Sequence, residues 1–365
     1  MRRRDFLARA LAACAVPAAR PARAASPAPV PPDGYPPVLP GLVLAFPADR
    51  GSHPRHRIEW WYATGHLESP RGPLGFQVTF FRLRNREAEA NPSRFSPSQL
   101  LFAHAAIADP AHGRLRHDER IARAQPGLAE AREGETDVFI DDWSFRREGE
   151  TYRARIPGEG LALDLALAVT QPVLPQGAAG YSRKGPRPGQ ASGYYSEPQL
   201  AATGTVVLGT ERIAVTGVAW LDHEWSSEIL GGEAVGWDWA GLNLDDGGAL
   251  MAFRLRNTAG DTVWAGGTWR DAKGATRVFG EREVRFEPAR RWKSPRTGVE
   301  WPVAMRLSVP GGDWTIAPLL DDQELDARRS TGTLYWEGAV RATGPGGAAA
   351  RGYLELTGYG RALRF

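Results

Sequence analysis

WWYATGHL, residues 60–67, has a second copy far along the chain in WDWAGLNL, residues 237–244, and this pair decides the fold that the sequence predicts. The two stretches align without gaps, and both begin with tryptophan and end with leucine. Each is followed by the same pentapeptide, FRLRN, at residues 81–85 and again at residues 253–257. A repeat over this distance indicates a duplicated structural unit.

Shorter matches extend the repeat over most of the chain. In chain order they pair FAHAAIAD (102–109) with WAGGTWRD (264–271), IPG (156–158) with VPG (309–311), ATG (202–204) with ATG (342–344), and VTG (215–217) with LTG (356–358). Each match is short, but their common order favours an internal duplication. We therefore predict two similar units, residues 45–228 and residues 229–365.

The local pattern within the units is that of β-strands. In LALDLALAVT, residues 161–170, leucine or valine occupies alternate positions, which is typical of a strand with one buried face. Clusters of Gly, Pro and Asp recur between such runs and favour antiparallel hairpins. We predict an all-β fold of two tandem antiparallel β-barrels, with about eight to ten strands in each, a number that suits a barrel holding one small ligand. Two packed sandwiches without a cavity are the alternative.

Residues 1–24 are predicted to be an export signal. They have a basic start, a short apolar stretch and the small-x-small cleavage site ARA at 22–24. RRDFL, residues 3–7, resembles the twin-arginine export motif. The alternative is LAAC, residues 11–14, which resembles a lipoprotein box with Cys14 as the lipid-bearing residue. We expect a periplasmic or secreted protein that meets a membrane only if Cys14 is lipidated, with a proline-rich linker over residues 25–44.

Charge and composition exclude several classes of protein. The export signal holds six arginines and one aspartate, so the net charge of +3 falls to about −2 without it. Such a chain lacks the concentrated basic face that nucleic-acid binding requires. Cys14 is the single cysteine, which leaves the folded part without a disulfide or a thiolate metal site. Neither G-x-S-x-G nor G-x-G-x-x-G occurs, and HPRH (53–56) has a proline between its histidines, so we expect no cofactor and no metal.

The densest group of reactive side chains is in WLDHEW, residues 220–225. On a strand, Asp222 and Glu224 share one face with Trp220, whereas His223 and Trp225 share the other, so only one set can enter a cavity unless a bulge intervenes. An inward acidic face would place two carboxylates about 7 Å apart along the strand, and burial would raise the pKa of one of them. An inward His223 would instead exchange protons near neutral pH. Structural roles, such as pairing with arginine or a satisfied core histidine, are the alternative for all three.

Polar or aromatic positions that differ between the two units are candidates for function rather than for packing. The alignment sets Glu59 against Gly236, Trp61 against Asp238 and His104 against Gly266, and it sets DHE (222–224) against the last residues, 363–365. SGYYSEP (192–198) has only a partial counterpart in TLYWEGAV (333–340). Together with indoles whose faces can stabilise a cation, the candidate ligand-binding residues are Glu59, Trp61, His104, Tyr194, Tyr195, Trp225, Trp237 and Trp239. A rim charge at Glu59 and a buried structural His104 are the alternatives.

Several longer motifs, in the right order, resemble the AttH-like and carotenoid 1,2-hydratase family. They are IEWWYATGHL, GFQVTFFRLR, FAHAAIAD, YSRKG, WLDHEWSSE, GWDWAGLNLDDGGALMAFRLR, DQE, YWEGAV and GYLELTGY. The resemblance covers residues 45–365 and implies two lipocalin-like β-barrel domains. It also implies export and an association with transporter permeases of the ABC type.

The resemblance further implies a chemistry. The characterised branch of the family adds water across a terminal carbon–carbon double bond of acyclic carotenoids. Carried over by motif, the acid would be Asp222 or Asp238, with His223 assisting and Trp237 or Trp239 facing the cation. The candidate catalytic residues are therefore Asp222, His223, Glu224 and Asp238.

Two functions of different classes follow. The first is an exported lipocalin-like protein that binds a hydrophobic, lipid- or isoprenoid-like small molecule and works with an ABC-type export system. The second is a cofactor-independent hydro-lyase or hydrolase that acts on an apolar substrate.

Overall fold

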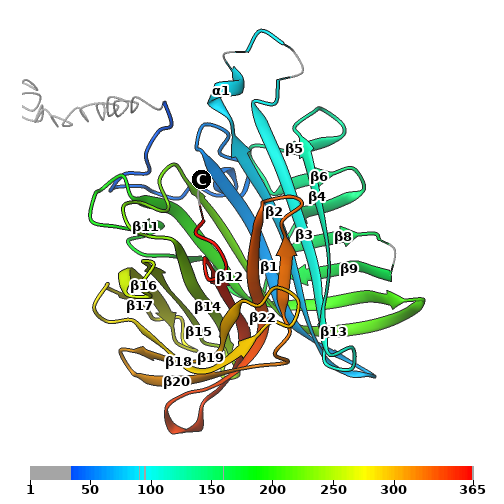
Figure 1. The fold of residues 1–365 in the computed structure, drawn as a ribbon, viewed down its shortest axis with the longest axis vertical. Coiled ribbons are helices and arrows are strands. Elements are labelled where there is room, and N and C mark those ends of the chain that lie inside the picture. The colour runs from blue at the N-terminus through cyan, green and yellow to red at the C-terminus, as the bar shows by residue number, and fades with distance from the viewer. Residues whose placement is uncertain (1–33, 90, 94–95, 159, 364–365) are drawn as a thin grey trace, which may run out of the picture.

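The computed structural model describes residues 34–365, apart from 90, 94–95, 159 and 364–365. The predicted export signal, Cys14 and the first part of the predicted linker lie outside the described residues. Within this range the chain forms two curled antiparallel β-sheets that pack against each other, one blue to green and the other green to red in Figure 1. Among the described residues, no helix has the length and apolar character needed to cross a bilayer.

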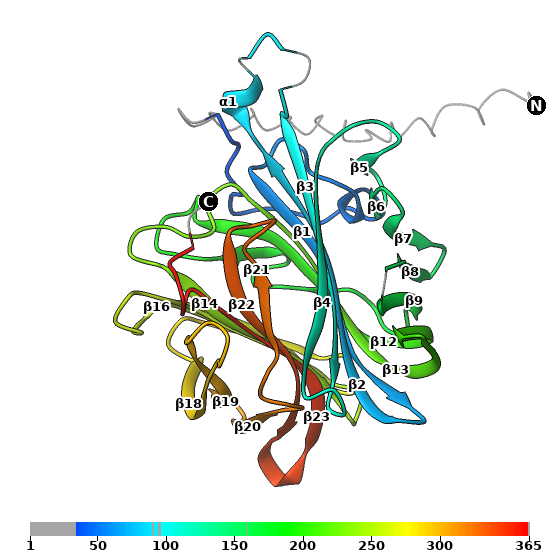
Figure 2. The ribbon, with the colours of Figure 1, turned by 45° about the vertical axis from the view of Figure 1, so that its right-hand side comes forward.

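The first sheet contains 13 strands within the described residues. Its main path is β4-β3-β2-β1-β13-β12-β9-β8-β7-β6-β5, while β10 and β11 both pair with β12. The sheet curls until β3 and β4 lie against β5, β6 and β9 (Figure 2). The strands are β1 (Ile58–Ser69), β2 (Gly72–Arg84), β3 (Gln99–Asp109), β4 (Arg114–Arg123), β5 (Ala129–Ala131), β6 (Asp137–Ile140), β7 (Trp143–Glu148), β8 (Thr151–Ile156), β9 (Gly160–Ala168), β10 (Leu174–Pro175), β11 (Tyr181–Arg183), β12 (Ala191–Gly209) and β13 (Glu211–Ser226). Two short helical turns accompany them, η1 (Ala48–Arg50) and α1 (Arg86–Glu89).

The second sheet contains 10 strands among the described residues, with the path β17-β16-β15-β14-β23-β22-β20-β19-β18 and β21 paired to β22. The strands are β14 (Gly236–Leu244), β15 (Ala249–Arg256), β16 (Thr262–Arg270), β17 (Thr276–Phe279), β18 (Arg285–Lys293), β19 (Glu300–Val309), β20 (Gly312–Pro318), β21 (Glu324–Ala327), β22 (Thr333–Thr343) and β23 (Ala349–Thr357). One helical turn, η2 (Pro345–Gly347), joins the last two.

The two sheets have the same strand order, which confirms the predicted all-β fold of two tandem barrels that arose by duplication. The path from β4 through β1, β13 and β12 to β7 repeats as the path from β17 through β14, β23 and β22 to β18. The chain leaves the first sheet at Ser226 and enters the second at Gly236. The unit boundary between residues 228 and 229 stays a prediction.

The predicted match of VTG (215–217) with LTG (356–358) is wrong. Tyr62 in β1 pairs with Asp222, and the counterpart of Tyr62 in β14, Trp239, pairs with Glu355. Residues 222–224 therefore correspond to 355–357 and not to 363–365, of which 364 and 365 lie outside the described residues. The hydrogen-bond ladder to the neighbouring strand fixes the register of the two units. A three-residue motif, by contrast, can be aligned at the wrong position when the strands differ in length.

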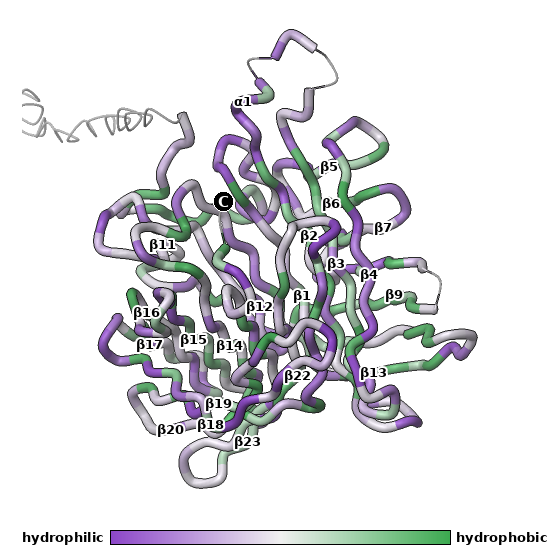
Figure 3. Tube along the Cα trace, viewed as in Figure 1, coloured by the Kyte–Doolittle hydropathy of each residue, from purple (hydrophilic) through white to green (hydrophobic). Residues whose placement is uncertain are grey.

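Alternation along the strands divides the buried side chains into three main clusters. One cluster fills the interior of the first barrel and one fills the second. A third cluster, rich in aromatic side chains, lies between the sheets and includes Tyr62, Trp220, Trp239, Phe253 and Tyr353. Figure 3 shows apolar and polar residues interspersed along the strands of both sheets, as expected for strands whose two faces meet different surroundings.

Gly75 in β2 faces Ala339 and Tyr353 of the second sheet across a close contact. A β-carbon at this position would lie 2.4 Å from Cβ of Ala339 and 3.0 Å from the hydroxyl oxygen of Tyr353. We expect Gly75→Ala to force the sheets apart and to lower the free energy of unfolding by about 1–3 kcal/mol, measured by urea denaturation. The control is Gly189→Ala, whose β-carbon would meet its nearest neighbour, Pro37, at 3.5 Å. Equal stability of the two variants would contradict the close packing.

Candidate functional site

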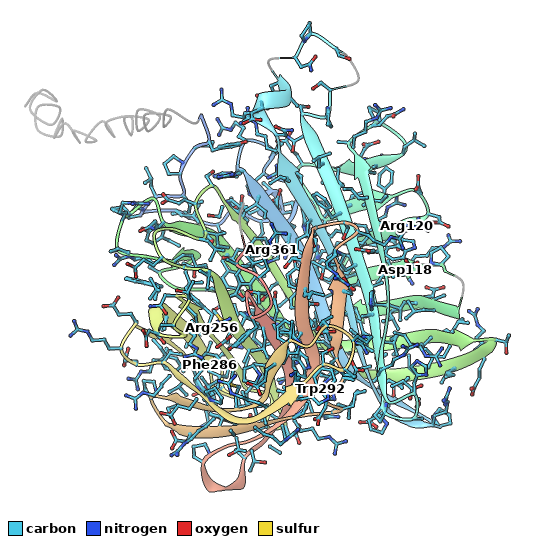
Figure 4. The ribbon with its side chains drawn as sticks, in the orientation of Figure 1. Asp118, Arg120, Arg256, Phe286, Trp292 and Arg361 are labelled. Atoms are coloured by element: carbon cyan, nitrogen blue, oxygen red, sulfur yellow. The ribbon has the colours of Figure 1, made fainter. Side chains whose placement is uncertain are left out.

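A cavity of about 430 Å³ lies between the two sheets, and its size is within the range of small-molecule sites. The first sheet lines it with Tyr62, Tyr194, Asp222 and Glu224, and the second sheet lines it with Trp237, Trp239, Glu337 and Glu355. The turn of residues 330–333 and the C-terminal residues 361–363 border it. Arg361, labelled in Figure 4, belongs to this border and is exposed.

The acidic face of β13 points into the cavity, which resolves the question that strand alternation left open. Asp222 and Glu224 line the cavity, whereas His223 and Trp225 lie on the opposite face. The ladder between β1 and β13 is continuous from Ile58 to Glu68, so no bulge brings the second face round. The structure therefore separates the two acids of DHE from its histidine.

Asp222 is buried at the end of a network of hydrogen-bond donors. Tyr194 donates to Oδ2 at 2.6 Å, while Ser196 and Trp220 donate to Oδ1 at 2.5 and 2.6 Å. Burial raises the pKa of Asp222 to about 7, and the three donors, which favour the ionised form, oppose that rise. The Tyr194 hydroxyl also accepts a hydrogen bond from Trp239 at 3.0 Å, so the network links the two sheets.

Glu224 has a partner that sequence reasoning did not assign to it. The ammonium group of Lys184 lies 2.9 Å from Oε1 of Glu224, and both side chains are buried. The same ammonium group lies over the ring of Phe253 at 4.0 Å and that of Tyr194 at 4.9 Å from the centroids. Lys184 therefore neutralises Glu224 and closes part of the cavity wall with a cation–π contact.

A second pair of acids, which sequence reasoning missed, lines the facing wall. Glu337 in β22 and Glu355 in β23 are direct cross-strand partners, so their side chains leave the sheet on the same face. Burial raises the pKa of Glu337 to about 8, while burial and the neighbouring charge of Glu337 raise that of Glu355 well above its ordinary value. Glu355 occupies the position that corresponds to Asp222. A correct alignment of the last strands would have revealed it.

His223 belongs to a buried network inside the first barrel. Its Nε2 lies 3.0 Å from Oε1 of Glu59, the same oxygen that lies 2.7 Å from Nδ1 of His53. The guanidinium of Arg82 donates to the other oxygen of Glu59 at 2.8 Å. Although burial acts against ionisation, the charge of Arg82 and the hydrogen bonds from both histidines hold the pKa of Glu59 well below its usual range. The predicted residues Trp61, Tyr195 and Trp225 surround this network through ring contacts with the two histidines.

The network around Glu59 contains the donor atoms that a metal ion would use. Atoms of His53, Glu59 and His223 lie within 4.8 Å of one another. Both histidine nitrogens, however, are already at hydrogen-bond distance from one carboxylate oxygen, and Arg82 pairs with the other. An ion would have to enter between groups that already satisfy each other. The geometry therefore favours a network held by protons, and we assign no metal to it.

Two other predicted site residues do not reach the cavity. Asp238 is fully buried on the opposite face of β14, where Arg254 and Arg256 donate to it at 2.7 and 2.8 Å (Arg256 is labelled in Figure 4). The expectation that Asp238 shares the site with Asp222 is therefore wrong, because Trp239, its neighbour along the strand, takes the inward position. His104 is buried beside the border of the cavity, with Nε2 at 2.9 Å from the hydroxyl oxygen of Ser330.

The comparison with protein families decides the affiliation of this chain. The AttH-like family profile matches residues 37–359. The chain belongs to the AttH-like family. Its sequence is 53% identical to that of an AttH-like protein, NE1406 of Nitrosomonas europaea, whose crystal structure at 2.00 Å superposes with a TM-score of 0.83 and covers 88% of this chain and 99% of that one. The resemblance inferred from the motifs is confirmed.

A second solved structure has the same fold at much lower sequence similarity. Kievitone hydratase from Nectria haematococca is 15% identical, with a TM-score of 0.66 over 86% of this AttH-like chain and 93% of its own. At that identity the likeness establishes the shared fold. Among curated proteins, no sequence matches this chain significantly.

The carboxyl pair predicts a pH dependence of stability. Since the pKa of Glu337 is raised to about 8 in the folded protein and is near 4.3 in an unfolded chain, the folded form holds a proton that the unfolded form has released between these values. The contribution of this protonated glutamate to the stability of the fold therefore falls as the pH rises through this window.

We expect the free energy of unfolding to be lower at about pH 8 than at about pH 5.5, by on the order of 1–3 kcal/mol from this pair. Glu337→Gln, which cannot ionise, should flatten the difference, as measured by urea denaturation at both pH values. The control is Glu68→Gln. Glu68 is exposed and forms an ion pair with Arg351, and its variant should retain the wild-type slope. A wild-type slope in Glu337→Gln would contradict the raised pKa.

Proposed function

We propose that this AttH-like protein binds an apolar, lipid- or isoprenoid-like small molecule in the cavity between its two sheets. The observation that carries the proposal is the cavity itself, about 430 Å³ in volume and walled by aromatic side chains from both sheets, among them Trp237, Trp239 and Tyr194. Sites for small molecules are concave and mostly apolar, with a few polar groups that orient the ligand. Asp222, Glu337 and Glu355 are polar groups of this kind.

Export and partnership are further parts of the proposal. The basic, twin-arginine-like start of the chain supports delivery to the periplasm or secretion, with lipid attachment at Cys14 as the alternative. Association with an ABC-type export system rests on the family resemblance alone. Export and association with a transporter both suit a protein that carries an apolar ligand between a membrane and its destination.

Removal of one cavity indole tests the binding proposal. We expect Trp237→Ala to weaken the binding of an apolar fluorescent probe such as Nile red by at least about tenfold, since the indole supplies contact area inside the cavity. Trp292→Ala removes a half-buried indole that packs on the second barrel (Figure 4) and should leave the affinity unchanged. Fluorescence titration gives both affinities. Equal loss in the two variants, or no binding by the wild type, would contradict the proposal.

A cofactor-independent hydro-lyase is the second candidate function, and the environment of Asp222 favours it. Asp222 faces the cavity with a pKa raised to about 7, so a protonated carboxyl group is available near neutral pH. In this reaction Asp222 gives its proton to one carbon of an alkene, and the aromatic wall stabilises the cation on the other carbon. Water adds to that carbon and returns a proton to the carboxylate. The fold shared with kievitone hydratase is compatible with this chemistry.

Asp222→Asn separates the two functions. We expect it to abolish incorporation of oxygen from labelled water into a terminal isoprenoid alkene, a loss of at least about a hundredfold, because the amide cannot supply the proton. Binding of the apolar probe should persist in the same variant. Mass spectrometry of the product measures the chemistry. Wild-type incorporation of label in Asp222→Asn would refute Asp222 as the acid.

A further inference from the structure

The cavity holds more carboxyl groups than the protein pairs with cations. Within the part of the chain that the structure describes, four carboxyl groups line it, those of Asp222, Glu224, Glu337 and Glu355. Lys184 pairs with Glu224, and among the described residues no lysine, arginine or histidine forms an ion pair with the other three. Arg82 also borders the cavity, but its guanidinium is taken up by Glu59 and by neighbouring oxygens.

Two buried polar atoms, one on each of the facing walls, lack both a hydrogen-bond partner and an ion-pair partner among the described residues. They are Oε2 of Glu337 and the hydroxyl oxygen of Tyr62, whose side chains are 3% and 4% exposed. Both residues line the cavity. Because buried polar groups in proteins are almost always hydrogen-bonded, an unpartnered carboxylate oxygen and an unpartnered hydroxyl that face the same space indicate a polar ligand. The carboxylate oxygen of Glu337 accepts, so it calls for a ligand that donates hydrogen bonds, and the Tyr62 hydroxyl can accept from the same ligand.

The arrangement of the pair adds a requirement for positive charge. Glu337 and Glu355 lie directly opposite each other on adjacent strands, where two like charges repel. Trp239 is the cross-strand neighbour of Glu355 on its other side and lines the same cavity. Carboxylates next to an indole face are the surroundings that bind a cation by charge and by cation–π contact.

We propose that the ligand of this cavity carries a primary ammonium group, which binds between Glu337 and Glu355 while its apolar body lies against Phe81, Phe253 and Trp237. The inference rests on the proposed binding function and specifies the chemistry of the ligand. A primary ammonium group has three N–H donors, enough for both glutamates and the Tyr62 hydroxyl. A quaternary ammonium group has none and leaves Glu337 Oε2 unsatisfied. Without a cation, the raised pKa values of both glutamates keep the pair protonated.

Three probes with the same alkyl chain test the inference on the full-length mature protein. Dodecylamine, dodecanol and dodecyltrimethylammonium, each below its micelle concentration, are titrated by isothermal calorimetry near neutral pH. We expect dodecylamine to bind at least about tenfold more tightly than either of the others. We also expect dodecylamine binding to release a proton from the pair, seen as an enthalpy that varies with the ionisation enthalpy of the buffer. Dodecanol should show no such dependence.

Two variants locate the effect. Glu337→Gln should reduce the affinity for dodecylamine to that for dodecanol and remove the proton release, while the affinity for dodecanol stays unchanged. Glu68→Gln, exposed and outside the cavity, should behave as the wild type. If Glu337→Gln does not fold, as judged by circular dichroism, Glu355→Gln serves in its place, and the comparison of probes on the wild type needs no variant.

The outcomes separate this inference from the function on which it rests. Dodecanol bound as tightly as dodecylamine, or amine binding unaffected in the glutamine variant, overturns the ammonium site and leaves the apolar-ligand function in place. Dodecyltrimethylammonium bound as tightly as dodecylamine overturns the requirement for N–H donors. Absence of binding by all three probes overturns both proposals.

Discussion

The alternation of side chains along β13 is the constraint on which the rest of the structure depends. Successive residues of a strand point to opposite faces, and β13 lies between β1 and β12, with both of its faces buried over residues 219–226. One face delivers His223 to the interior of the first barrel, and the other delivers Asp222 and Glu224 to the cavity between the sheets. One strand thus supplies polar groups to two separate interiors. A slip of one residue would exchange the two sets, so the register of this strand determines the chemistry of both.

Each barrel interior contains a buried carboxylate that is matched by arginine. In the first barrel Glu59 pairs with Arg82, and in the second Asp238 pairs with Arg254 and Arg256. Loss of either partner would leave an uncompensated buried charge, which is strongly destabilising. These networks link β1 to β2 and β14 to β15, the strands that carry much of the cavity wall. They therefore hold the wall in one geometry, as supporting residues of a binding site do, and of the five residues named here Arg82 alone borders the cavity.

Duplication explains why acids occur on both walls, and divergence explains why they differ. Asp222 and Glu355 occupy equivalent positions in the two sheets, next to Ser196 and Glu337 respectively. Ser196 donates a hydrogen bond to Asp222, which favours the ionised carboxylate. Glu337 offers a second carboxyl group instead, so the equivalent position in the second sheet must take up a proton or a cation. The difference between Ser196 and Glu337, beside acids at equivalent positions, thus changes what each wall of the cavity can bind.

The sequence by itself determined the fold and the identity of the acids on β13. Period-two alternation reports local backbone geometry, and the repeated motifs report internal homology. Each of these signals can be recognised within short stretches of sequence. Tryptophans 237 and 239 were found for the same reason. The assignment of Glu59, Trp61, Tyr195, His223 and Trp225 to a network away from the cavity was decided only by the tertiary structure. Alternation tells which side chains share a face but not which face the second sheet covers, because that depends on how two distant sheets pack. The pairing of Glu337 with Glu355 was not predicted for a related reason. The register of β23 is fixed in part by hydrogen bonds to β14, which is far away in the sequence.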